Sequence, residues 1–112
     1  MFKYLLNEIL AKVYLRVRQI IDKELIEMIL YGSYARGDFD QESDIDVAVI
    51  VNNSRINIKK YRRELIALMS DLSLEYDIVL DITCIPLSDF EKYKDVLPYY
   101  RNINNEGVRI VA

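Results

Sequence analysis

The stretch Gly32-Ser-Tyr-Ala-Arg-Gly-Asp-Phe-Asp-Gln-Glu-Ser-Asp-Ile-Asp46 joins two apolar runs of the chain. The run over 25–31 predicts a short buried strand, and the β-branched residues of the run over 44–51 predict a second strand. Because side chains alternate between the two faces of a strand, we expect Asp44 and Asp46 on one face, about 6.5 Å apart. The stretch thus links a glycine-serine turn to a pair of carboxylates at the start of the next strand.

The other apolar patterns predict the rest of the fold. Apolar residues spaced three and four apart indicate one helix through about residue 21 and another over 58–72. A third strand is expected over 78–85, then short helices, and 108–111 is compatible with an edge strand. This order predicts an α/β (α+β) fold, with helices packed on a small mixed sheet. The length and the 52% hydrophobic content predict a single domain over residues 1–112.

The composition excludes several classes of function. The chain has no histidine, which excludes Ser-His-Asp and Cys-His catalysis and a histidine-ligated zinc site. Its net charge of −3 argues against strong general binding of nucleic acid. The single cysteine, Cys84, fits a reducing cytoplasm, and its apolar neighbours indicate a buried packing residue rather than a nucleophile. Charges within the first apolar stretch argue against a signal peptide or membrane span.

The residues around the two strands predict a site for a metal and a phosphate group. Two like charges at the start of a buried strand repel each other, and a bound Mg²⁺ would remove that repulsion. Gly32 allows a close approach of the backbone, so that amide groups and the Ser33 hydroxyl can hold phosphate oxygens. Arg36 adds a nearby cation. We therefore predict that Asp44 and Asp46 bind the metal and that the turn binds phosphate oxygens.

A third carboxylate is expected from the third strand. Asp81 lies among apolar residues, where a lone carboxylate is costly unless it is paired or bound to metal. Beside Asp44 and Asp46 it would complete a cluster for two metal ions. Asp77 is the alternative, because it lies at the strand entrance and shares a strand face with Asp81. Asp81 is favoured over Asp77.

Two other charged groups have simpler interpretations. Asp38, Asp40 and Glu42 do not fit a calcium loop, because glycine and glutamate are missing from the positions that an EF-hand requires. We interpret them as part of a solvated loop. Five cations between residues 55 and 63 form a basic cluster at the start of a predicted helix. A solvated helix face is favoured there over a site for nucleic acid or a partner.

The spacing of these residues matches a known pattern. Gly32-Ser33, ten further residues and Asp44-Ile-Asp46 resemble the signature of the DNA polymerase β-like nucleotidyltransferase superfamily. The form Gly-Ser-Tyr-Ala-Arg-Gly and the small size resemble the minimal nucleotidyltransferases (MNT), many of which are antitoxins in HEPN/MNT toxin–antitoxin pairs. The resemblance covers nearly the whole chain and implies the polymerase β-like nucleotidyltransferase fold. It also implies that Gly32 and Ser33 hold the nucleotide phosphates, Asp44 and Asp46 the metal ions, and that Asp81 lies next to the attacking hydroxyl.

The resemblance implies an activity as well. Members of such pairs transfer AMP from ATP to a tyrosine of the HEPN partner, which silences that ribonuclease, and two Mg²⁺ ions are expected in the reaction. One alternative is an antitoxin that neutralises its toxin by binding alone. Another is a small-molecule nucleotidyltransferase, which the lack of a substrate domain disfavours. The sequence leaves open the acceptor, the base preference, the number of AMP units and the oligomeric state.

Overall fold

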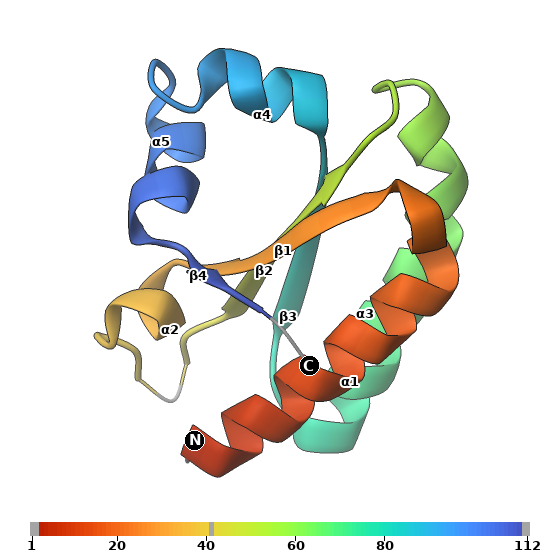
Figure 1. Ribbon diagram of the computed structural model, residues 1–112. Coiled ribbons are helices and arrows are strands. Elements are labelled where there is room, and N and C mark those ends of the chain that lie inside the picture. Colours follow the sequence, from red (N-terminus) through yellow and green to blue (C-terminus); the bar gives the residue numbers. More distant parts are fainter. Residues whose placement is uncertain (1–2, 41, 111–112) are drawn as a thin grey trace.

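The computed structural model of the chain describes residues 3–40 and 42–110 (Figure 1). Its elements are, in order, α1 (Lys3–Ile21), η1 (Asp22–Glu24), β1 (Leu25–Tyr31), α2 (Ser33–Arg36), β2 (Ile45–Val51), η2 (Asn57–Tyr61), α3 (Arg62–Tyr76), β3 (Leu80–Pro86), α4 (Leu87–Tyr93), α5 (Pro98–Glu106) and β4 (Val108–Arg109). The predicted order of helices and strands is confirmed. The short helical turn α2 was not predicted, since its sequence was interpreted as turn-rich loop.

Four strands form one mixed sheet in the order β3-β2-β1-β4. β1 is antiparallel to both β2 and β4, whereas β2 and β3 are parallel. A parallel pair needs a crossover connection, and η2 with α3 supplies it between β2 and β3. The predicted α+β class with a mixed sheet is therefore confirmed. β3 is an edge strand, and this position matters for the site.

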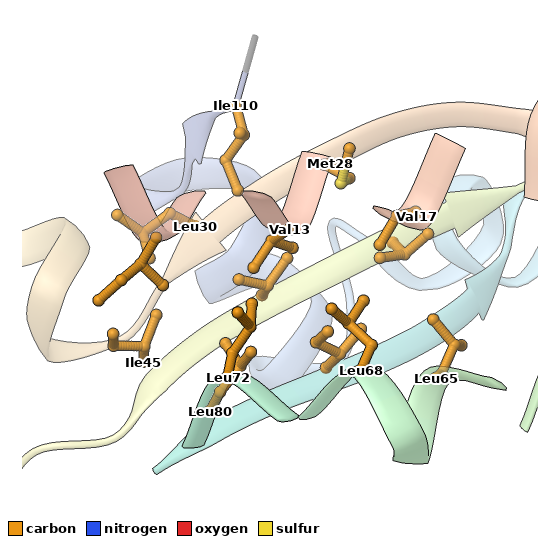
Figure 2. Close-up of a cluster of buried hydrophobic side chains, with 14 of the residues drawn as sticks. Val13, Val17, Met28, Leu30, Ile45, Leu65, Leu68, Leu72, Leu80 and Ile110 are labelled. Atoms are coloured by element: carbon orange, nitrogen blue, oxygen red, sulfur yellow. The ribbon is translucent and has the colours of Figure 1, made fainter. Parts of the chain in front are cut away.

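Helices cover both faces of the sheet (Figure 1). α1 and α3 pack on one face, where the larger core cluster lies, and α4 and α5 pack on the other face. The period of the α1 sequence explains its packing, because Ile9, Val13 and Val17 are four residues apart and are all fully buried. Figure 2 shows the larger cluster, to which both helices and three strands contribute, with labelled side chains that include Val13, Val17, Met28, Leu30, Ile45, Leu65, Leu68, Leu72 and Leu80.

The element boundaries differ from the prediction in small ways. β2 begins at Ile45, so Asp44 lies directly before the strand instead of being its first residue. β3 spans Leu80–Pro86, two residues later at its start than expected. The edge strand β4 contains Val108 and Arg109, and the last predicted strand residue, 111, lies outside the described part of the chain. Within residues 3–40 and 42–110, no helix combines the length and apolarity that crossing a bilayer requires.

Candidate active site

The turn after β1 lies directly against a carboxylate of β2. Gly32 has φ 75° and ψ −155°, a backbone conformation that is essentially restricted to glycine. A Cβ atom at Gly32 would lie 2.5 Å from Oδ2 of Asp46. The missing side chain thus brings the start of α2, with Ser33 as its first residue, into contact with Asp46. The glycine-serine turn therefore lies next to the Asp46 carboxylate, as the sequence predicted.

The second carboxylate of the site comes from the neighbouring parallel strand. Asp46 of β2 is the register partner of Asp81 in β3, and adjacent strands lie about 4.8 Å apart. Paired residues of parallel strands point to the same face, here the face that α4 and α5 cover farther along the strands. Asp44 directly precedes β2 and is exposed, while Asp46 is half-buried. Asp46 therefore lies between the turn on one side and Asp81 on the other.

The surroundings of Asp46 disfavour its charged form. Burial raises the pKa of the Asp46 carboxyl above its ordinary value, and the nearby charges of Asp81 and Asp44 raise it further. Arg36 acts in the opposite direction, but the net shift is upward. A carboxylate that is partly buried among like charges is stabilised in its charged form by a bound metal ion.

The carboxylates fit a metal ion that completes its shell with other ligands. Within the described residues, no group of three or more His, Cys, Asp or Glu side chains is arranged to hold a metal ion. Mg²⁺ in nucleotide-dependent enzymes is usually held by one or two carboxylates together with substrate phosphates. The pairing of Asp46 with Asp81, next to Asp44 and the turn at Gly32, matches that donor set.

The structure separates the two candidates for the third carboxylate. Asp81 is in register with Asp46, whereas Asp77 lies outside β3 as the C-cap of α3, with a left-handed backbone conformation. Asp77 also lines a cavity of about 350 Å³ next to Ser43. The premise that Asp81 is buried is wrong: it is exposed, because β3 is an edge strand and Asp81 is near its start. Asp81 nevertheless lies beside Asp46 on the neighbouring strand, as expected.

Arg36 is held near the site by two carboxylates. Its guanidinium lies 3.2 Å from Asp38 and 3.5 Å from Glu106 at the end of α5. These two carboxylates are about half exposed, so the ion pairs are screened by solvent and can exchange for another anion. Arg36 therefore lies close to the turn while engaged with residues of the chain itself.

The acidic loop and the cysteine match their simpler interpretations. Asp38, Asp40 and Glu42 are exposed, and the Asp40 carboxylate accepts a hydrogen bond from the Glu42 amide at 2.9 Å, which shapes the turn. Cys84 is half-buried and packs against the larger core cluster. Burial raises the pKa of its thiol to about 11, so the reactive thiolate is rare at neutral pH.

A pair of tyrosines next to the carboxylates was not found from the sequence. Tyr31, the last residue of β1, is the register partner of Asp46, and its hydroxyl lies 2.8 Å from that of Tyr99 in α5. Burial, followed by the hydrogen bond with Tyr99, raises the pKa of Tyr31, while Thr83 of β3 acts in the opposite direction. The only signal in the sequence is that Tyr31 directly precedes Gly32, which does not reveal Tyr99.

Two relatives in Methanocaldococcus jannaschii, both named "putative protein adenylyltransferase", resemble this chain. One is 41% identical over 64 residues, which make up 57% of this chain and 63% of the relative. The other is 33% identical over 81 residues, which make up 72% of this chain and 73% of the relative. A further relative of the same name and organism is 34% identical, and the match spans 54% of its length. The chain thus spans between about half and three quarters of these proteins.

Solved structures share the fold at low sequence identity. A crystal structure of a toxin–antitoxin with AMP-PNP superposes with a TM-score of 0.62 at 21% identity, covering 92% of this chain and 73% of that one. The structure of a "putative minimal nucleotidyltransferase" superposes with a TM-score of 0.57 at 19% identity, covering 95% and 92% of the two chains. Residues 11–108 match the sequence profile of the nucleotidyltransferase domain, and they include the turn, Asp46 and Asp81. The chain therefore belongs to the nucleotidyltransferase domain family and has the fold of a minimal nucleotidyltransferase.

Proposed function

We propose that this chain is a Mg²⁺-dependent enzyme that transfers AMP from ATP to the hydroxyl group of a tyrosine on a partner protein. The observation that supports this most strongly is the direct contact of the Gly32 turn with Asp46, which is itself in register with Asp81. The names of the relatives point to a protein as the acceptor, and the toxin–antitoxin structure points to a toxin as the partner. In this proposal the partner is a HEPN-type ribonuclease and the chain is its cytoplasmic antitoxin.

The residues of the site have separate roles in the proposed reaction. Backbone amides of the turn and the Ser33 hydroxyl hold phosphate oxygens of ATP. Arg36 exchanges its exposed partners, Asp38 and Glu106, for the triphosphate. These contacts orient the triphosphate, and positioning with electrostatic stabilisation accounts for most of the catalysis of such a transfer.

The carboxylates hold the metal and receive the proton. Asp44 and Asp46 would bind Mg²⁺, with Asp81 as a further ligand beside the acceptor, and a metal ion held there would supply positive charge next to the phosphates. The acceptor oxygen bonds to the α-phosphorus, the bond from that phosphorus to the bridging oxygen breaks, and pyrophosphate leaves. Asp81 is exposed at the sheet edge, where it can accept the proton of the incoming hydroxyl.

The test is a double variant, Ser33→Ala with Asp46→Asn, in an assay with the partner toxin. With the wild-type chain and Mg²⁺–ATP, the toxin should gain the mass of one or more AMP groups and stay inactive after the chain is removed. The double variant should not add AMP and should not protect cells that express the toxin. Circular dichroism should show a folded variant, because Ser33 is the first residue of α2 and Asp46 is the second residue of β2.

Two results would contradict the proposal. Protection by the double variant equal to that by the wild-type chain would show that neutralisation needs no chemistry, as for an antitoxin that acts by binding. AMP transfer to a small hydroxyl compound, without transfer to any protein, would show that the acceptor is a small molecule and not a protein.

A further inference from the structure

A groove with an apolar floor and a basic rim lies on the side of β3 that faces α3. Its volume is about 480 Å³, and it is lined by Arg55, which lies in the loop before η2, and by residues of η2, α3 and β3. Ile66, Met69 and Ile82 contribute to the apolar floor, and Lys59 and Arg62 lie on the rim. Ile66 is 50% exposed and the nearby Ile56 is 75% exposed, so apolar surface at and beside the groove is open to solvent.

The groove lies beside the free edge of β3, where side chains of α3 bond to that strand. The amide of Leu80 donates to Oγ of Ser73 at 3.3 Å, and the amide of Ile82 donates to Sδ of Met69 at 3.2 Å. Side chains of α3 thus satisfy the edge of β3 over its first half. Met69 and Ile82 also line the groove, and Cys84, farther along β3, is another of its lining residues.

The charge of this region is opposite to that of the whole chain. Residues 55–63 contain five cations and no acidic residue, although the chain has a net charge of −3. Arg55 pairs with Asp89 at 2.7 Å and Lys60 pairs with Glu24 at 3.2 Å. Of the three cations that line the groove, Arg55 is thus paired, whereas no carboxylate of the described residues lies within 4.0 Å of the side-chain nitrogens of Lys59 or Arg62. A ligand of this groove should therefore combine apolar groups with negative charge.

We propose that the groove docks an acidic amphipathic segment of the partner protein, with the apolar side chains of that segment on the groove floor and its carboxylates at Lys59 and Arg62. A protein segment is favoured over RNA because none of the described residues that line the groove is aromatic, and single-stranded nucleic acid is usually bound by stacking on aromatic rings. Apolar anchors in a groove with charges at the rim are typical of bound amphipathic helices.

The docking surface rests on the proposed function and would serve the same reaction. Ile82 on the groove floor directly follows Asp81, and their side chains point to opposite faces of β3. Because β3 is an edge strand, a partner docked in the groove can pass around its edge toward Asp81. The groove would then raise the local concentration of the acceptor hydroxyl near the carboxylates.

The probe is a fluorescent synthetic helical peptide with leucine on one face, glutamate on the other and one terminal tyrosine. Binding is followed by fluorescence anisotropy with the full chain, in comparison with a lysine version of the peptide and a single-stranded RNA oligonucleotide. Arg62→Glu and Ile66→Asp should each weaken binding of the acidic peptide about tenfold or more. The matched controls are Arg63→Glu and Leu74→Asp, which change exposed residues of α3 that do not line the groove, and they should leave the affinity within about twofold.

The outcomes separate the docking surface from the chemistry. All four variants should bind Mg²⁺–ATP like the wild-type chain, and Asp46→Asn should keep peptide binding while losing AMP transfer to the peptide tyrosine. Peptide binding without transfer by the wild-type chain would contradict the proposed function and leave the docking surface intact. Failure to bind the acidic peptide, equal effects of the groove and control variants, or a preference for RNA would each overturn the docking proposal.

Discussion

Gly32→Ala tests whether the turn and Asp46 form one unit. Alanine at φ 75° and ψ −155° would adopt a conformation that costs about 1–3 kcal/mol. Its Cβ would lie 2.5 Å from Oδ2 of Asp46, so the carboxylate must rotate away, and an unfavourable side-chain conformation adds about 0.5–1.5 kcal/mol. Together these effects should lower the free energy of unfolding by about 2–4 kcal/mol.

Gly37→Ala is the matched control. Gly37 also has positive φ, 83°, but a Cβ there would meet no atom within 4 Å. Its substitution should cost only the left-handed conformation, about 1–2 kcal/mol. With an unfolding entropy of about 2.1 cal/mol/K per residue, each kcal/mol lowers the Tm of a chain of this size by about 4 °C. We therefore expect Tm to fall by about 8–16 °C for Gly32→Ala and about 4–8 °C for Gly37→Ala.

Ligand binding distinguishes the two variants more sharply than stability does. Isothermal calorimetry with Mg²⁺–ATP, at a temperature where both variants are folded, should show lost binding for Gly32→Ala because Asp46 is displaced. Gly37→Ala should bind as the wild-type chain does. If the two variants have equal Tm values and bind Mg²⁺–ATP equally, the inferred contact between the turn and Asp46 is not what places that carboxylate.

Three further predictions concern single carboxylates. Asp46→Asn should raise Tm in EDTA at pH 7, because the raised pKa of Asp46 means that its charged form opposes folding above that pKa. Asp81→Asn should abolish AMP transfer, measured by mass spectrometry, whereas Asp77→Asn should retain it and remain folded, since asparagine tolerates the left-handed cap. Glu24→Gln should flatten the loss of stability in denaturant titrations as the pH falls from about 4.5 to about 2, because the pKa of Glu24 is lowered to about 2 in the folded chain.

The sequence was sufficient for the parts of the site that depend on local geometry. A glycine that ends a buried strand and two aspartates at the start of the next strand are close because the two strands pair directly. The larger core was also predictable, since the apolar spacing of α1 and the run of β2 match helix and strand periods. In each case residues close together in the sequence determine which side chains come into contact.

Features that depend on long-range pairing were not predictable in the same way. Nothing local in the sequence of β3 reveals that it is an edge strand. The prediction that Asp81 is buried was therefore wrong, although its predicted position beside Asp46 is observed. The pair of Tyr31 and Tyr99 joins residues 68 positions apart, from two elements that meet only in the folded chain. The packing of α5 against β1 determines such contacts, and they cannot be inferred from the composition of the chain or the spacing of its residues.

Glu24 and Asp46, whose pKa values shift in opposite directions, show how structure separates a stabilising acid from a candidate functional one. Glu24 accepts hydrogen bonds from Tyr61 and Asn53 and pairs with Lys60, and these donors hold its pKa at about 2. It ties η1 to the loop after β2 and to η2, so its negative charge stabilises the fold. Asp46 has the opposite surroundings, with burial and two like charges that raise its pKa. The charged form of Asp46 lowers the stability of the fold, and a bound cation would offset that loss. This is the physical reason to look for a metal–nucleotide complex at Asp46 rather than at Glu24.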